Sequence, residues 1–180
     1  MTSPLYIAGL LIMLALAVIF DLKMRKIPNM VVLFGLVFSL ILQYSTAGGA
    51  GVFSWILGVC VGFLCFFPLH LLRGMAAGDV KLMMAVGGFL GCPLVITAAL
   101  YSLIAGGLMA IIYLIYKGKL GALVAKTKLI IFNIFEKTTT GQSLYDMNPT
   151  KTSLGRMPYA QAIAVGTVIA CYLRASTQFI

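Results

Sequence analysis

Two aspartates, Asp21 and Asp79, stand at the ends of strongly apolar stretches and are the residues of this chain best placed for acid–base chemistry. Asp21 follows the apolar run Leu5–Phe20, and Asp79 lies where the run Val80–Leu90 begins. The chain has only four acidic residues in all. A carboxylate in the middle of a membrane helix costs roughly 2.5–3.5 kcal/mol on insertion scales. Carboxylates kept beside such runs therefore indicate a function.

A pair of carboxylates can hydrolyse an amide bond. One carboxylate takes a proton from water, while the other polarises the carbonyl under attack and a proton passes to the leaving amine. Like charges held close together cannot both ionise, so such a pair shares one proton. The sequence contains neither HExxH nor GxSxG. We therefore expect no metal and no cofactor.

Each aspartate also has a structural interpretation when it is taken alone. Asp21 could be a loop residue paired with Lys23 or Arg25. Asp79 could cap the helix that follows it. Taken together, however, the two aspartates are expected at one membrane level, and the apolar runs contain no other acid. This combination favours a functional pair.

The composition is that of an integral membrane protein. Hydrophobic residues make up 62% of the 180 residues and charged residues 9%, whereas soluble domains contain about 25% charged residues. The apolar runs are rich in Leu, Ile, Ala, Gly and Met and lack the alternation of barrel strands. We predict an all-α fold, a polytopic membrane helical bundle that forms a single domain over residues 1–180.

Hydropathy predicts about six transmembrane helices, several of them shorter than the ~20 residues that cross a ~30 Å hydrocarbon core. Their ranges are Leu5–Phe20, Met30–Tyr44, Val52–Leu72, Val80–Leu90, Pro93–Tyr116 and Pro158–Leu173. Residues 120–136 mix lysines with apolar residues, which predicts one interfacial amphipathic helix rather than a seventh span. With the polar stretch that follows, residues 120–156 form the predicted cytoplasmic helix and loop.

The basic residues predict the orientation of these helices. Every Lys and Arg except Arg174 lies in or directly beside alternate connections, and residues 45–51 and 91–92 contain none. The positive-inside rule then places both termini outside and Asp21 and Asp79 together at the cytoplasmic face. The net charge of +9 is explained by these loops and by anionic lipid, so we expect membrane lipid and no nucleic acid as partners.

Two other features have modest predicted roles. The spacings Gly58–Gly62 and Gly87–Gly91 fit GxxxG, which lets helices approach closely, and we interpret them as packing. His70 lies at the cytoplasmic end of the third predicted span. It is either a titrating helper near the aspartates or an ordinary interfacial residue.

Three segments resemble motifs of the type IV prepilin peptidases, which are membrane aspartyl proteases of the GxGD type. GMAAGDVKLMMAVGGFLG, around Asp79, resembles the motif of one family aspartate, and DLKMRKIPN, which starts at Asp21, resembles the motif of the other. The segment from Arg156 to Gly166 resembles the start of the family's last helix. The resemblance covers nearly the whole chain.

The resemblance implies roles for individual residues. Asp21 and Asp79 would be the catalytic pair. Gly78 would let the backbone approach Asp79 and a substrate strand closely. Lys81 would steady the helix end or bias the protonation of the pair, or serve only as a cytoplasmic anchor.

The segment after Asp21 and the turn before Asp79 supply the remaining motif residues. Pro28 and Asn29 would shape the start of the second span, because proline suits the first turn of a helix. Ala76 stands where the GxGD pattern has its first glycine, and it would be strained if that position required a positive φ.

The chain lacks the insertion with paired CxxC motifs that longer family members carry. It therefore resembles the short branch that serves tight-adherence (Flp-type) pili, with peptidase activity and without N-methyltransferase activity. The implied partner is a prepilin or pseudopilin with a basic leader and an apolar helix. Cleavage would occur at the cytoplasmic boundary of a bacterial inner membrane.

Two alternatives remain open from the sequence. An inactive homologue could act as a pilus or secretion assembly subunit, which Ala76 favours. A small proton- or cation-coupled carrier could use the aspartates for ion binding. A carrier predicts acids nearer the membrane centre and internal repeats, and no long repeat is visible.

Overall fold

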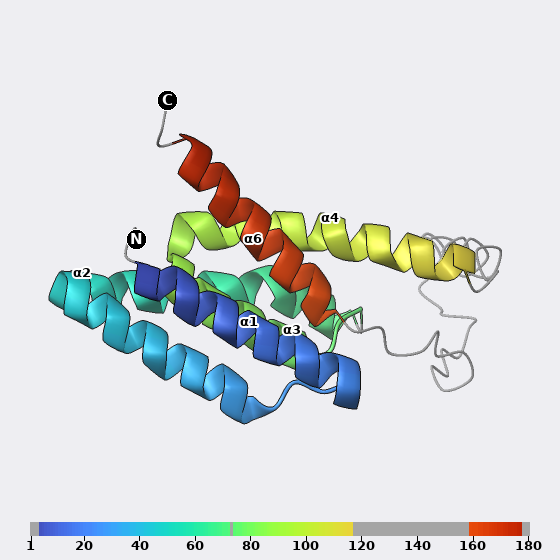
Figure 1. Cartoon of the computed structure of the whole chain (residues 1–180), viewed down its shortest axis with the longest axis horizontal. Coiled ribbons are helices and arrows are strands. Elements are labelled where there is room, and N and C mark those ends of the chain that lie inside the picture. Colours follow the sequence, from blue (N-terminus) through green and yellow to red (C-terminus); the bar gives the residue numbers. More distant parts are fainter. Residues whose placement is uncertain (1–3, 73, 117–158, 178–180) are drawn as a thin grey trace, which may run out of the picture. The chain divides into compact units, whose positions relative to one another are not determined.

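The structure, a computed structural model, describes residues 4–72, 74–116 and 159–177, and these residues form helices without any strand (Figure 1). The helices are α1 (Pro4–Met24), α2 (Asn29–Leu71), α3 (Ala77–Leu90), α4 (Cys92–Tyr116) and α6 (Ala160–Thr177). The predicted all-α class is confirmed. The predicted interfacial helix over residues 120–136 and the loop to residue 156 lie outside the described residues.

The chain divides into two compact units. The first comprises residues 1–107 and 158–180, and the second comprises residues 108–157. The described part of the second unit is the C-terminal end of α4, residues 108–116. Both aspartates and all the contacts described below belong to the first unit.

Helix α2 folds back on itself at Gly48. This glycine has φ 55° and ψ −131°, a conformation that glycine adopts without a side-chain clash. The Trp55 indole Nε1 donates a hydrogen bond of 2.9 Å to the Ser39 hydroxyl. In a straight helix these residues would be about 24 Å apart. The two arms of α2 are therefore neighbours, and they correspond to the predicted spans Met30–Tyr44 and Val52–Leu72.

The lengths of the helices do not establish six membrane crossings. Within the described residues, α1, α2 and α4 are long and apolar enough to cross a membrane. Helix α3 has 14 residues and α6 has 18, below the ~20 that a ~30 Å core requires. Each of the six predicted spans nevertheless has a helical counterpart, because α2 supplies two arms.

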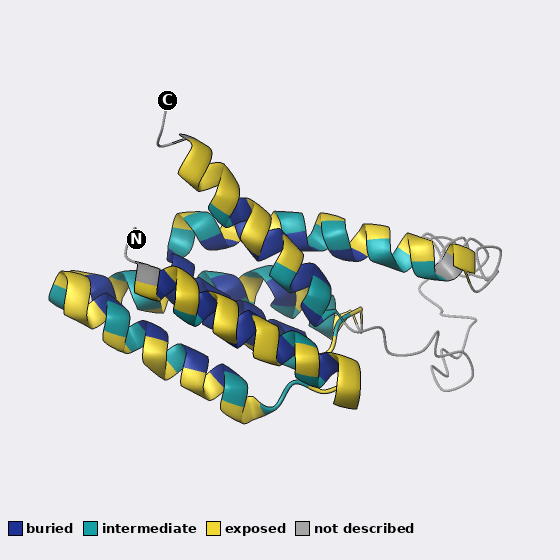
Figure 2. Ribbon diagram, viewed as in Figure 1, coloured by how far each residue is buried: buried dark blue, intermediate teal, exposed yellow. Residues whose placement is uncertain are grey.

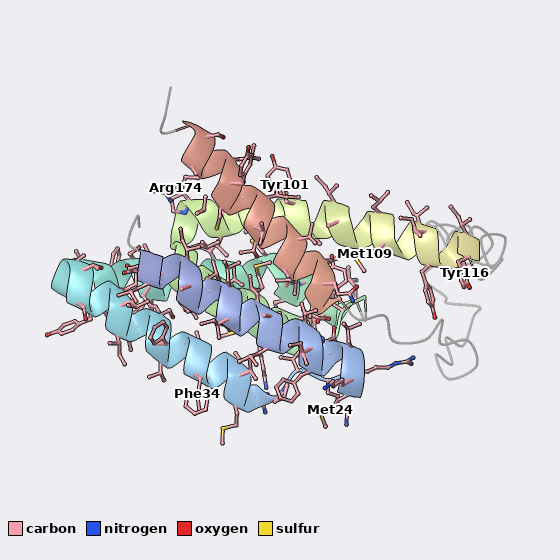
Figure 3. The ribbon with its side chains drawn as sticks, in the orientation of Figure 1. Met24, Phe34, Tyr101, Met109, Tyr116 and Arg174 are labelled. Atoms are coloured by element: carbon pink, nitrogen blue, oxygen red, sulfur yellow. The ribbon has the colours of Figure 1, made fainter. Side chains whose placement is uncertain are left out.

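The outer faces of α1 and α2 are apolar and exposed, as expected of surfaces that contact lipid (Figure 2). Phe34 and Met24 point away from the bundle (Figure 3) and are 71% and 63% exposed. The opposite faces of these helices carry the buried residues.

Helix α3 forms the centre of the first unit. It contacts α1, α2 and α6, and most of its residues are buried (Figure 2). Gly58 of α2 faces the carbonyl of Gly87, and Gly62 faces the carbonyl of Met83, so closely that a Cβ at either glycine would collide with the α3 backbone. The predicted packing role of these glycines is confirmed, and it lets α3 lie against the second arm of α2.

We expect Gly58→Ala to destabilise the protein, because its methyl group has no space against the Gly87 carbonyl. Overpacking costs about 1–3 kcal/mol, which for a chain of this size lowers the Tm by roughly 2–4 °C per kcal/mol. The measurement is thermal unfolding in detergent. Gly107→Ala is the matched control, because no atom lies within 4 Å of the added Cβ there. Equal Tm values for the two variants would contradict the close crossing.

Candidate active site

The two aspartates lie on different helices whose ends meet. Asp21 is in the last turn of α1, and Asp79 is in the first turn of α3. Helices α1 and α3 contact each other, and both contact α6. Figure 1 shows the end of α1 and the starts of α3 and α6 at the same end of the first unit. Each aspartate is 6% exposed, so each carboxylate needs partners within the protein.

Asp21 is bonded to the start of the last helix. Its Oδ2 accepts a hydrogen bond of 3.0 Å from the backbone N–H of Ala160, the first residue of α6. The first N–H groups of a helix have no partner within the helix, and the helix dipole stabilises negative charge there. The amide of Ala160 thus satisfies an otherwise costly buried carboxylate, and the carboxylate satisfies an orphan amide.

The chain after Asp21 leaves the helix sharply. The N–H of Arg25 bonds to the Asp21 carbonyl at 2.9 Å, and Arg25 has φ 51°, in the left-handed region. Such a residue commonly ends a helix. Pro28 is the N-cap of α2 in an extended conformation, and Asn29 is the first residue of that helix. Both residues thus lie where α2 begins, and their role in shaping that start stays a prediction.

Asp79 is held by the backbone that precedes it. The Ala76 N–H donates to the Asp79 Oδ2 at 3.2 Å, and the Asp79 N–H donates to the Ala76 carbonyl at 3.1 Å. This reciprocal pair resembles a capping box, with a backbone carbonyl in place of the usual side-chain hydroxyl. The carboxylate also lies in the first turn of α3, where the helix dipole favours its charge.

Tyr159 holds the chain where it enters α6. It directly precedes Ala160, the residue whose amide binds Asp21. Its hydroxyl donates a hydrogen bond of 3.1 Å to the Ser102 carbonyl, and its ring lies edge-on to the ring of Phe66, with the centroids 6.2 Å apart. Helix α6, which follows, contacts both of the helices that carry the aspartates.

A further contact joins the two motif segments. The Lys81 Nζ donates to the Asn29 Oδ1 at 3.1 Å. The segment that follows Asp21 is in this way tied to the helix that carries Asp79. Lys81 and Asn29 are exposed, so the bond adds little stability by itself and serves mainly to link the ends of two helices.

Ala76 and Gly78 occupy ordinary backbone conformations. Ala76 has φ −78° and ψ 150° and is the N-cap of α3, so alanine is not strained there. A Cβ added to Gly78 would lie 3.5 Å from the Ile27 Cβ, an ordinary van der Waals contact. The described residues therefore leave room for a side chain at Gly78. Its role towards a substrate strand stays a prediction.

A comparison with known protein families shows to which family this chain belongs. The chain matches the family model of the type IV leader peptidases over residues 8–111, more than half of its length. It belongs to the type IV leader peptidase family. The matched region of this leader peptidase family member includes Asp21, Asp79 and the motif residues around them. No curated protein and no solved structure matches the chain significantly.

The sequence did not predict the parts played by Tyr159 and Ala160. The segment from Arg156 to Gly166 resembles the start of the leader peptidase family's last helix, which pointed to the region without assigning a role. The donor to Asp21 is a backbone amide, and every residue except proline has one. The identity of Ala160 therefore contains no signal of its contact, which depends on where α6 begins.

We expect Ala160→Pro to impair the site, because proline removes the amide that binds Asp21 while still fitting the first turn of α6. Cleavage of a prepilin should fall at least about tenfold, as expected when a buried carboxylate loses a partner. Gln161→Pro is the matched control, since proline also enters the first turn but the Ala160 amide remains. Similar losses in both variants would indicate a general disturbance of α6.

We expect Gly78→Ala to insert and unfold like the wild type, because the added methyl meets Ile27 only at van der Waals distance. If a substrate strand passes this glycine, the same variant should raise the KM for a prepilin several-fold. Thermal unfolding and cleavage kinetics on one preparation separate the two effects. Unchanged kinetics would remove Gly78 from the substrate path.

Proposed function

We propose that this member of the family is a membrane aspartic endopeptidase that removes the leader from type IV or Flp-type prepilins or pseudopilins. The observation that carries the proposal is the burial of two carboxylates on α1 and α3, helices that contact each other and α6, with Asp21 bonded to the first amide of α6. Burial of charge without a functional reason is disfavoured in so apolar a chain. Membership of the leader peptidase family supplies the reaction class.

In the proposed reaction, Asp21 and Asp79 act as a dyad that holds one proton. The ionised carboxylate accepts a proton from water, and the resulting hydroxide equivalent attacks the scissile carbonyl. The protonated carboxyl donates to the carbonyl oxygen, and the collapse of the tetrahedral intermediate transfers a proton to the departing amine. The amides of Ala160 and Ala76 orient one oxygen of each carboxylate, which is the preorganisation that such a step requires. The reaction needs no metal or cofactor.

The proposed location is the cytoplasmic boundary of a bacterial inner membrane. The exposed side chains of Lys23, Arg25 and Lys26 follow Asp21 directly, and Lys81 follows Asp79 closely. The positive-inside rule assigns this end of the bundle to the cytoplasm, which leaves both termini outside after six crossings. A prepilin with an apolar helix would lie along the bundle, and its basic leader would extend towards the anionic headgroups.

The substrate branch rests on the resemblance. The short chain without paired CxxC motifs points to Flp-type prepilins and to cleavage without N-methylation. The alternatives gain little support. The relaxed backbone of Ala76 offers no reason for an inactive homologue, and aspartates at helix ends do not suit a carrier with a mid-membrane ion site.

The test is prepilin processing in membranes, followed as a gel shift of a co-expressed Flp-type prepilin. Asp21→Asn and Asp79→Asn keep the shape of each side chain and remove its acid–base function. We expect each to reduce cleavage at least about 100-fold. Asp146→Asn, the same substitution at an acid outside the described residues, should cleave normally. Cleavage by either of the first two variants at the wild-type rate would contradict the dyad.

A further inference from the structure

The only histidine of the chain, His70, binds the turn that precedes Asp79. It lies in the last turn of α2, and its Nδ1 is 2.9 Å from the carbonyl oxygen of Met75. A carbonyl oxygen can only accept, so the Nδ1 must carry the hydrogen. The bond therefore requires the ring to present its Nδ1–H to the Met75 carbonyl.

The turn between α2 and α3 is fixed by a succession of bonds. The N–H of Leu72 donates to the Pro68 carbonyl at 3.0 Å, and the N–H of Gly74 donates to the Leu69 carbonyl at 2.9 Å. The bond from His70 to Met75 comes next along the chain. Met75 also packs against the hydrophobic core. The imidazole thus supplies the last contact of the turn before the backbone reaches the N-cap of α3.

The carbonyl that His70 binds and the amide that Asp79 binds belong to one peptide group. The Met75 carbonyl accepts from His70, and the Ala76 N–H donates to the Asp79 Oδ2 at 3.2 Å. A trans peptide is planar, and its C=O and N–H point in opposite directions. A side chain that fixes the carbonyl therefore fixes the direction of the N–H. Hydrogen bonds at the two ends of one amide also polarise each other.

We propose that His70 is a positioning residue of the active site, which orients the Met75–Ala76 peptide so that the Ala76 amide holds the Asp79 carboxylate. The proposal rests on the proposed function for its catalytic consequence. Its structural part, the orientation of one peptide group, does not depend on cleavage. The histidine acts through the peptide, and a contact with substrate is not part of the role.

The test compares three single variants and one double variant of the full-length protein in detergent with a Flp-type prepilin. His70→Leu removes the donor, and we expect kcat to fall about tenfold with KM changed less than twofold, as for a lost orienting contact. His70→Asn places an amide N–H near the position of the Nδ1 and should restore most of kcat. Ala76→Pro removes the amide itself, and adding His70→Leu to it should cause no further loss.

A second measurement makes the two proposals separable. The Ala76 residue is exposed, so hydrogen exchange of its amide, followed in protein labelled with ¹⁵N-alanine, reports the bond to Asp79. We expect His70→Leu to speed this exchange about tenfold and His70→Asn to leave it near the wild-type rate. If the wild type does not cleave but exchange responds in this way, the proposed function fails and the positioning role stands. An unchanged exchange rate in His70→Leu, or additive losses of kcat in the double variant, would overturn the positioning role.

Discussion

The burial of two carboxyl groups is the constraint on which the rest of the structure depends. Asp21 and Asp79 lie in a chain that is mostly apolar, and each is nearly inaccessible. A buried carboxylate without partners is strongly unfavourable. Backbone amides at the beginnings of two helices offset this cost. The start of α6 supplies the amide that binds Asp21, the start of α3 supplies the amide that binds Asp79, and the dipoles of both helices favour negative charge there. The positions of these two helices are therefore linked to the charge of the site.

Close packing of α3 makes this solution possible. The glycines of α2 bring the backbone of α3 against the second arm of that helix, and the fold-back at Gly48 returns the chain for this contact. The short turn between α2 and α3 then places Asp79, in the first turn of α3, at the same end of the unit as the last turn of α1. A bulkier crossing would move the first turn of α3 and with it the carboxylate.

Much of this arrangement could be predicted from the sequence, and the rest could not for definable reasons. The apolar runs end at Asp21 and begin at Asp79, so hydropathy alone placed both acids at helix ends, and GxxxG spacing predicted the close crossing. The contacts of the Ala160 amide and of His70 with the Met75 carbonyl involve backbone groups. Such groups are the same in every residue, so no pattern of side chains reveals them. Six crossings were inferred from charge as well as hydropathy, and the 14 residues of α3 show why helix length alone does not establish them.

The bond between Asp21 and Ala160 joins residues 139 positions apart, and this separation affects how the protein is made. Synthesis proceeds from the N-terminus, so both aspartates are translated well before the amide that binds Asp21. Until α6 is in place, the carboxyl group of Asp21 lacks this partner. The hydrogen bonding of Asp21 is therefore complete only after α6 has been synthesised. Residues 8–111, which match the family model, contain both acids but not the Ala160 amide that binds Asp21.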